Sequence, residues 1–107
     1  MTQISFDLHS YDGPALINGV GFARVRLAES AEQHGPGMVK YWEGTGEVAR
    51  SAAPDVTPDW AFGPVEVRLP DGGTGTAFIS GMTLSANRLG AETWALDLRG
   101  KGPSPMA

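Results

Sequence analysis

VEVRLPDGGTGTAFISGMTL, residues 65–84, is the stretch of the sequence that decides the fold class. Apolar residues at positions 65, 67 and 69 alternate with Glu66 and Arg68, and this two-residue period is typical of a half-buried strand. Residues 70–73, Pro-Asp-Gly-Gly, follow as a hairpin turn signal, and residues 76–84 form the returning strand. The stretch therefore predicts an antiparallel strand pair.

Further strands are indicated on both sides of this hairpin. Residues 93–99 continue the pattern, with Trp94, Leu96 and Leu98 facing inward. Upstream, the sequence predicts strands over residues 4–8, 21–28 and 38–49. Turns are expected at 12–14, 35–37 and 87–90, and one helical turn is expected over 28–33. Gly44 and Gly46 inside the third of these strands suggest a sharp bend or a close backbone approach.

The strand count and the turn spacing predict an all-β fold, a small antiparallel barrel of six to seven strands with one long irregular loop over residues 50–63. The chain has 107 residues, among them 15 Gly and 8 Pro, which suits one domain of short strands joined by tight turns. We assign residues 1–102 to a single β-barrel domain. Residues 103–107 are expected to form a flexible C-terminal tail.

Composition argues against several classes of function. The net charge of −4, with 8 scattered basic residues, disfavours nucleic acid and anionic membrane surfaces as partners. The absence of Cys excludes disulfides and thiolate chemistry. His9 and His34 are 25 residues apart without further ligand spacing, so we expect no metal site and no cofactor. No signal peptide or membrane span is recognisable, which makes the cytoplasm the expected location.

The most distinctive segment is Lys-Tyr-Trp-Glu-Gly at residues 40–44. On a strand, Tyr41 and Glu43 share one face and Trp42 lies on the other. One interpretation is a core Trp42 with a solvated pair on the outer face. The other is an aromatic wall with one carboxylate, in which Glu43 or Tyr41 would be the catalytic candidate.

A second group of aromatic residues lies in the long loop. Trp60 and Phe62 either cap one end of the core or form a lid over a pocket, since two aromatic rings are unfavourable to leave exposed. Barrel mouths are common positions for ligand pockets. The sequence therefore nominates Tyr41, Trp42, Trp60 and Phe62 as ligand-binding residues.

Several short motifs, taken in order, resemble a small actinobacterial β domain of unassigned function. They are Tyr-Asp-Gly-Pro-Ala at 11–15, Val-Arg-Leu at 25–27, Trp-Glu-Gly at 42–44, Val-Arg-Leu-Pro-Asp-Gly at 67–72 with Gly75 and Ala77, and Leu-Arg-Gly-Lys-Gly-Pro at 98–103. The resemblance implies an accessory module often fused to flavin-dependent monooxygenases, and it implies no catalytic residues. Residues 50–63 have no clear counterpart in that family.

Two functional hypotheses follow. The first is a ligand- or partner-binding accessory module of bacterial, including secondary, metabolism, whose partner is a small apolar molecule, a partner protein or a second copy of the chain. The alternative is a cofactor-free cyclase or isomerase acting on a natural-product intermediate inside the barrel. Whether the protein is an enzyme stays open at this stage, because the second hypothesis requires an enclosed cavity.

Overall fold

The computed structural model describes residues 4–106, and within this range the fold is all-β, as the sequence predicts. Six strands and two short 3₁₀ helices follow one another along the chain. They are β1 (Ile4–Ile17), β2 (Val20–His34), β3 (Gly37–Ala49), η1 (Arg50–Ala52), η2 (Pro58–Phe62), β4 (Pro64–Arg68), β5 (Thr74–Ala86) and β6 (Glu92–Lys101). No helix among the described residues is long and apolar enough to cross a membrane.

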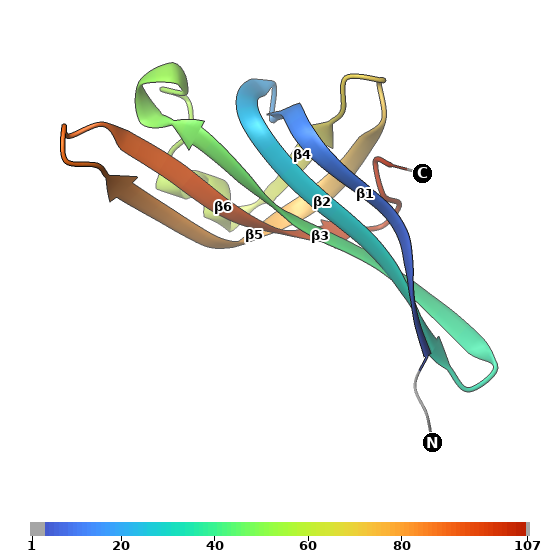
Figure 1. The fold of residues 1–107 in the computed structure, drawn as a ribbon. Helices are drawn as coiled ribbons and strands as arrows, with labels where there is room; N and C mark the ends of the chain where they lie inside the picture. The colour runs from blue at the N-terminus through green and yellow to red at the C-terminus, as the bar shows by residue number, and fades with distance from the viewer. Residues whose placement is uncertain (1–3, 107) are drawn as a thin grey trace.

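The strands form one antiparallel sheet that closes into a barrel in the order β1-β2-β3-β6-β5-β4 (Figure 1). The hairpin predicted from residues 65–84 is β4–β5, in which Val65 pairs with Ala77 and Val67 with Gly75. Closure is completed by β1 and β4, which pair only through Leu16 with Arg68 and Ile17 with Val67. This short seam is the weakest lateral contact between neighbouring strands.

Two local predictions were wrong. Residues 12–14 do not form a turn but lie inside β1, and residues 28–33 do not form a helical turn but extend β2. In both places the pairing of the two strands supplies main-chain partners, and these tertiary contacts override the local preferences for a turn or a helix.

The inward and outward positions of β2 also differ from the simple alternation in the sequence. The β1–β2 register shifts between Gly13 and Ala15, where two residues of β2 stand opposite Pro14. A bulge of this kind turns the side chains that follow it to the other face. Phe22 is therefore 1% exposed and Ala23 exposed, the reverse of what the pattern of β2 predicts.

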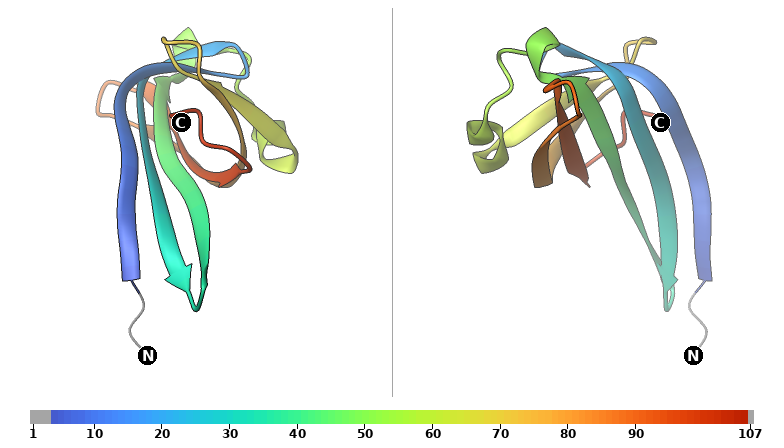
Figure 2. Two further views of the ribbon diagram at one scale, coloured as in Figure 1. Left: turned by 90° about the vertical axis from the view of Figure 1, so that its right-hand side faces the viewer. Right: turned by 60° about the vertical axis from the view of Figure 1, so that its left-hand side comes forward.

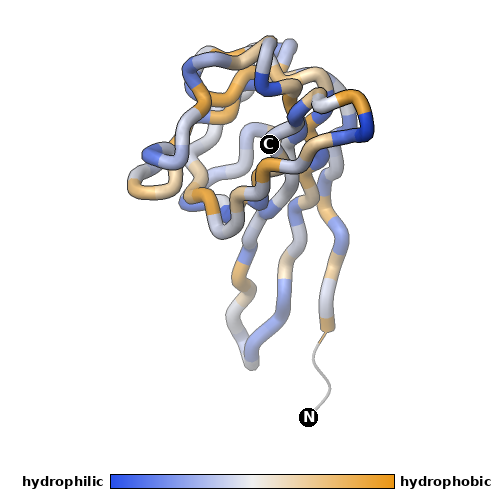
Figure 3. The backbone as a smooth tube through the Cα atoms, turned by 90° about the vertical axis from the view of Figure 1, so that its left-hand side faces the viewer, coloured by the Kyte–Doolittle hydropathy of each residue, from blue (hydrophilic) through white to orange (hydrophobic). Residues whose placement is uncertain are grey.

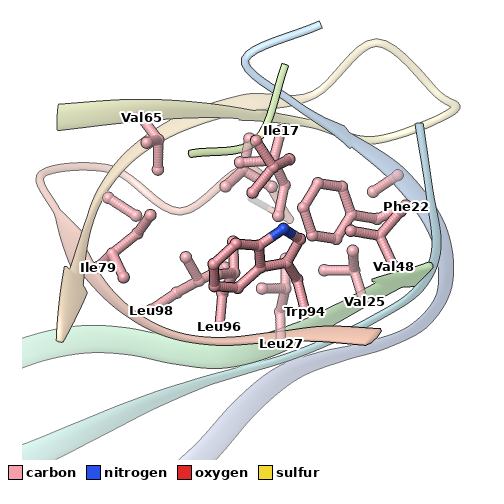
Figure 4. Close-up of a cluster of buried hydrophobic side chains, with 14 of the residues drawn as sticks. Ile17, Phe22, Val25, Leu27, Val48, Val65, Ile79, Trp94, Leu96 and Leu98 are labelled. Atoms are coloured by element: carbon pink, nitrogen blue, oxygen red, sulfur yellow. The ribbon is translucent and has the colours of Figure 1, made fainter. Parts of the chain in front are cut away.

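The barrel interior is filled by apolar side chains from all six strands (Figure 4). Trp94, Leu96 and Leu98 of β6 point inward, as predicted. The largest fully buried side chains are Phe22, Ile17, Leu96, Leu98, Val25, Val65 and Val67. Dense packing of this kind is the main source of stability for a domain of this size.

Half of the sheet continues beyond the barrel as an arm, defined here as residues 4–10 of β1, 28–34 of β2 and 37–42 of β3. Figures 1 and 2 show these three strands projecting from the barrel towards the 35–36 turn. The arm makes the molecule elongated, with extents of 52 × 29 × 24 Å. Its outer strands lack a second neighbour there, because β3 pairs with β6 only from Glu43 onward and β1 pairs with β4 only at its end.

Candidate functional site

The structure places the four nominated aromatic residues in different surroundings. Tyr41 and Trp42 are adjacent on β3, so their side chains leave opposite faces of the sheet. Trp42 is 3% exposed, whereas Tyr41 is 41% exposed on the outer face of the arm. Trp60 is partly buried in the loop, and Phe62 is 87% exposed. They do not form one common wall, and their role as ligand-binding residues stays a prediction.

Trp42 is held inside the barrel by glycines and by the C-terminal segment. Its indole N–H donates to the Gly102 carbonyl at 3.2 Å. A Cβ built at Gly100 would lie 2.2 Å from the indole, and one built at Gly75 would lie 3.0 Å from it. Any side chain at Gly100 would therefore displace the ring. Of the two interpretations of residues 40–44, the geometry corresponds to a core Trp42 with Tyr41 and Glu43 outside.

The long loop covers the core with its middle residues. Ala53 and Val56 are buried, and the Trp60 ring stacks on the core residue Phe22 with their centroids 6.4 Å apart and their planes inclined by 30°. At the start of the loop, Arg50 donates two hydrogen bonds to Glu92 of β6, at 3.0 and 3.1 Å. Trp60 thus takes the capping position, while Phe62 points to solvent.

Glu43 lines an outer groove of about 560 Å³ across β2, β3, β6 and β5. It stands directly opposite Arg99 of β6. The groove carries two basic side chains, Arg26 and Arg99, and two acidic ones, Glu43 and Asp97. Because Glu43 is exposed, the surroundings lack the burial that typically prepares a carboxylate for proton transfer.

Tyr41 lies on the outer face of the arm, and its ionisation is influenced by neighbouring carboxylates. Its hydroxyl donates to Glu32 at 3.2 Å. This hydrogen bond favours the neutral phenol and raises the pKa of Tyr41, with further increases from desolvation and from the negative charges of Glu32 and Glu43. Tyr41 is therefore a hydrogen-bond donor at neutral pH rather than a base.

The two histidines lie on the arm and pair with different carboxylates. His9 Nδ1 is 2.7 Å from the carboxyl group of Glu29, whose side chain is buried with 6% exposure. His34 Nε2 is 3.2 Å from Glu32. Within residues 4–106, no group of three or more His, Asp or Glu side chains could hold a metal ion.

Exposed apolar side chains are concentrated on the arm. Figure 3 shows hydrophobic segments continuing along its strands, outside the barrel. The pairing of the strands puts Ile4, Phe6 and Met38 on the face that continues the barrel interior, and Val39 on the other face with Tyr41. Among residues 4–106, six of the ten exposed large apolar residues belong to the arm: Ile4, Phe6, Leu8, Met38, Val39 and Tyr41. This concentration makes the arm the principal candidate interaction surface.

The two edges of the arm are not equivalent. The β1 edge carries a bulge at Leu8, Asp7 beside it and Pro14 further along, all features that block the addition of another strand. The β3 edge over residues 37–42 pairs with β2 without a register shift and carries one charge, Lys40. Its outward main-chain groups have no strand partner among the described residues. The β3 edge is thus the open edge.

The chain matches no protein-family model, no curated protein and no solved structure. The resemblance to the actinobacterial domain therefore stays a prediction.

Sequence reasoning missed the arm because its signal is weak. Glu29 and Gln33 occupy positions on the inward face of β2, so the apolar alternation fades after Leu27. The one available signal was the length of the strand predicted over residues 38–49, which is longer than most strands in globular proteins.

Proposed function

We propose that this protein is a non-catalytic protein-binding module whose arm pairs edge to edge with the arm of a second copy. The observation that carries the proposal is the open β3 edge over residues 37–42. This edge belongs to the arm, where exposed apolar side chains are concentrated. Strand addition to such an edge gains main-chain hydrogen bonds, and side chains on alternate positions supply specificity. A second copy is the simplest partner, because most soluble oligomers are built from identical chains and twofold dimers are the commonest of them.

The residues of the edge favour one register for this pairing. An antiparallel pair with Val39 on the twofold axis places Val39 against its own copy on the outer face. On the inner face, Met38 then stands opposite Lys40 of the second copy. The two Lys40 side chains are therefore not directly opposite each other. Cross-strand apolar pairs stabilise a sheet and like charges directly opposite destabilise it. Centring the pair on Lys40 is disfavoured for that reason.

The interface is small. Five paired residues span about 17 Å, well below the area of a standard stable interface, which is about 800 Å² per partner. We therefore expect a reversible dimer with a dissociation constant in the micromolar range or weaker, which forms at high concentration.

Sedimentation equilibrium over a wide concentration range tests the proposal. The wild-type chain is expected to move from monomer to dimer, and Val39→Lys is expected to keep it monomeric because it places two ammonium groups on the axis. Leu89→Lys is the matched control, since Leu89 is 94% exposed in the β5–β6 turn away from the arm. A wild-type chain that is monomeric throughout, or a dimer that persists in Val39→Lys, would overturn the proposal.

The alternative from the sequence, a cyclase or isomerase with its reaction inside the barrel, gains no support from the packing. Side chains such as Phe22, Leu96 and Leu98, each at most 2% exposed, occupy the interior where a substrate would have to bind. Its candidate residues, Glu43 and Tyr41, lie on the outer face. The accessory role in bacterial metabolism and the cytoplasmic location remain predictions from the sequence.

A further inference from the structure

The seam between β1 and β4 stops after two residue pairs, and the sequence explains why. Continuing the register beyond Leu16 and Arg68 would place Ala15 opposite Leu69 and Pro14 opposite Pro70. Proline has no N–H to donate to a ladder. Two prolines facing each other therefore prevent the seam from closing further.

The neighbouring main chain is also committed elsewhere. The N–H of Leu69 donates to Gly73 at 2.8 Å, and its carbonyl accepts from Gly72 at 2.9 Å, both within the β4–β5 turn. On the other side, the β1–β2 bulge lies opposite Pro14. The strands consequently separate at this point, and the separation is built into the fold.

A pocket of about 410 Å³ occupies the split, and we call it the seam pocket. Its walls are mostly apolar, and Phe22, which is 1% exposed, is one of the residues that line it. Arg68 is its one charged side chain. The full lining is Pro14, Ala15, Leu16, Gly21, Phe22, Arg68, Leu69, Pro70 and Gly72. The volume and the apolar walls with few polar groups are typical of small-molecule sites.

We propose that the seam pocket binds a small apolar molecule that carries one carboxylate. The apolar body would enter between Leu16 and Leu69, and the carboxylate would pair with the Arg68 guanidinium, a geometry that arginine favours. The present partner of Arg68 is Glu66 at 3.6 Å, and both side chains are more than half exposed. An exposed pair of this kind is weak, so a ligand carboxylate can replace it. This proposal does not depend on the arm.

Two glycines make the pocket testable. A Cβ built at Gly21 meets nothing within 4 Å, and Gly21 does not need a positive φ. Gly21→Leu is therefore sterically tolerated, and because Gly21 lines the pocket, we expect the new side chain to occupy part of it. Gly63 has equal space and an extended φ of −155° but lies outside the lining. Gly63→Leu is the matched control.

The experiment titrates each protein with octanoate and with octan-1-ol, its neutral counterpart, and follows amide shifts by ¹H–¹⁵N NMR. We expect shifts at Leu16, Gly21 and Leu69 in the wild-type chain, with octanoate binding about fivefold more tightly than the alcohol, the upper range for an exposed charge pair. Arg68→Gln should remove this difference while both compounds still bind. Gly21→Leu should abolish both interactions, and Gly63→Leu should leave both unchanged.

Other outcomes of these titrations would contradict the proposal or one of its parts. Shifts confined to the arm, or binding that survives Gly21→Leu, would remove the pocket as the site. Equal affinity for the acid and the alcohol in the wild-type chain would remove Arg68 as the anchor. Absence of any shift up to the solubility limit of the alcohol and millimolar octanoate would overturn the proposal as a whole.

Discussion

At several glycines, a neighbouring strand or ring packs so closely that no side chain would fit. Besides Gly100 and Gly75 beneath Trp42, Gly44 lies so close to the neighbouring strand that a Cβ there would stand 2.1 Å from the Arg26 carbonyl oxygen. The sequence predicts a bend or a close backbone approach at this position, and the close approach is confirmed. A residue without a side chain is required there because the contact is with main-chain atoms, which cannot move aside as a flexible side chain can.

The pKa of Tyr41 depends on its neighbour Glu32. Because the hydrogen bond to Glu32 is the largest cause of the raised pKa of Tyr41, Glu32→Gln should lower that pKa. The measurement is a spectrophotometric titration of the tyrosines, with Tyr11→Phe as the background so that only Tyr41 contributes. An unchanged midpoint in Glu32→Gln would show that the Glu32 carboxylate does not control this titration.

The sign of the linked stability follows from the direction of the shift. A folded-state pKa above the unfolded value of about 10 means that the contribution of Tyr41 is fully present below pH 10. It is lost as the pH rises through the folded-state pKa. We therefore expect Glu32→Gln to reduce the steepness of alkaline destabilisation, as followed by urea unfolding between pH 9 and pH 11.

At the scale of elements, the long loop is part of the core rather than a detached connection. Three of its residues, Ala53, Val56 and Trp60, pack into the core cluster. Its two 3₁₀ helices each provide one turn that positions such a residue. A connection of this length without secondary structure would be unusual in a small domain, and its buried anchors are the physical reason that it is held in place.

The pair Trp60 and Phe62 provides a matched test of this interpretation. Trp60→Ala should lower the free energy of unfolding by about 2–3 kcal/mol, since a partly buried ring stacked on Phe22 is lost. Phe62→Ala should change it by less than about 0.5 kcal/mol, because the ring is 87% exposed. Urea denaturation followed by circular dichroism measures both. Equal effects of the two substitutions would contradict a capping role for Trp60.

Some strand edges of the sheet have no paired neighbour. In the barrel, β6 has a paired strand on each side, whereas β5 pairs only with β6 over residues 79–86, and the arm leaves unpaired edges on β1 and β3. The β1 edge is protected by a bulge, a charge and a proline, and the β3 edge is not. Protection of one edge alone is expected if the other edge pairs with a partner, and this asymmetry underlies the proposed dimer.

At the scale of the whole molecule, the C-terminal segment contacts the barrel. Ser104 and Pro105 are buried, and Met106 packs against the core. A Cβ at Gly73 would lie 2.1 Å from the Pro105 carbonyl oxygen, and one at Gly75 would lie 2.7 Å from the Pro105 ring. The flexible tail expected over residues 103–107 stays a prediction, and residue 107 lies outside the described range. The packing of residues 104–106 suggests how to test it, by removing this segment and measuring stability.

Removal of residues 103–107 should therefore destabilise the domain. We expect the free energy of unfolding to fall by about 2 kcal/mol or more, because the buried Ser104 and Pro105 and the packed Met106 are lost and the apolar surface beneath them is exposed. Tryptophan emission should shift to longer wavelength in the same variant. Stability and emission equal to those of the complete chain would instead confirm a flexible tail.

The sequence by itself determined the all-β class, the β4–β5 hairpin and the inward face of β6. These features follow from two-residue alternation and turn chemistry, which are local in the chain. Only the tertiary structure decided that residues 28–34 extend a strand, that Trp42 points inward while Tyr41 points outward, and that the pairing of β1 with β4 ends at Leu16 and Arg68. These depend on register, bulges and closure between strands distant in sequence. A shift of one residue in pairing exchanges the two faces of a strand without changing its local pattern.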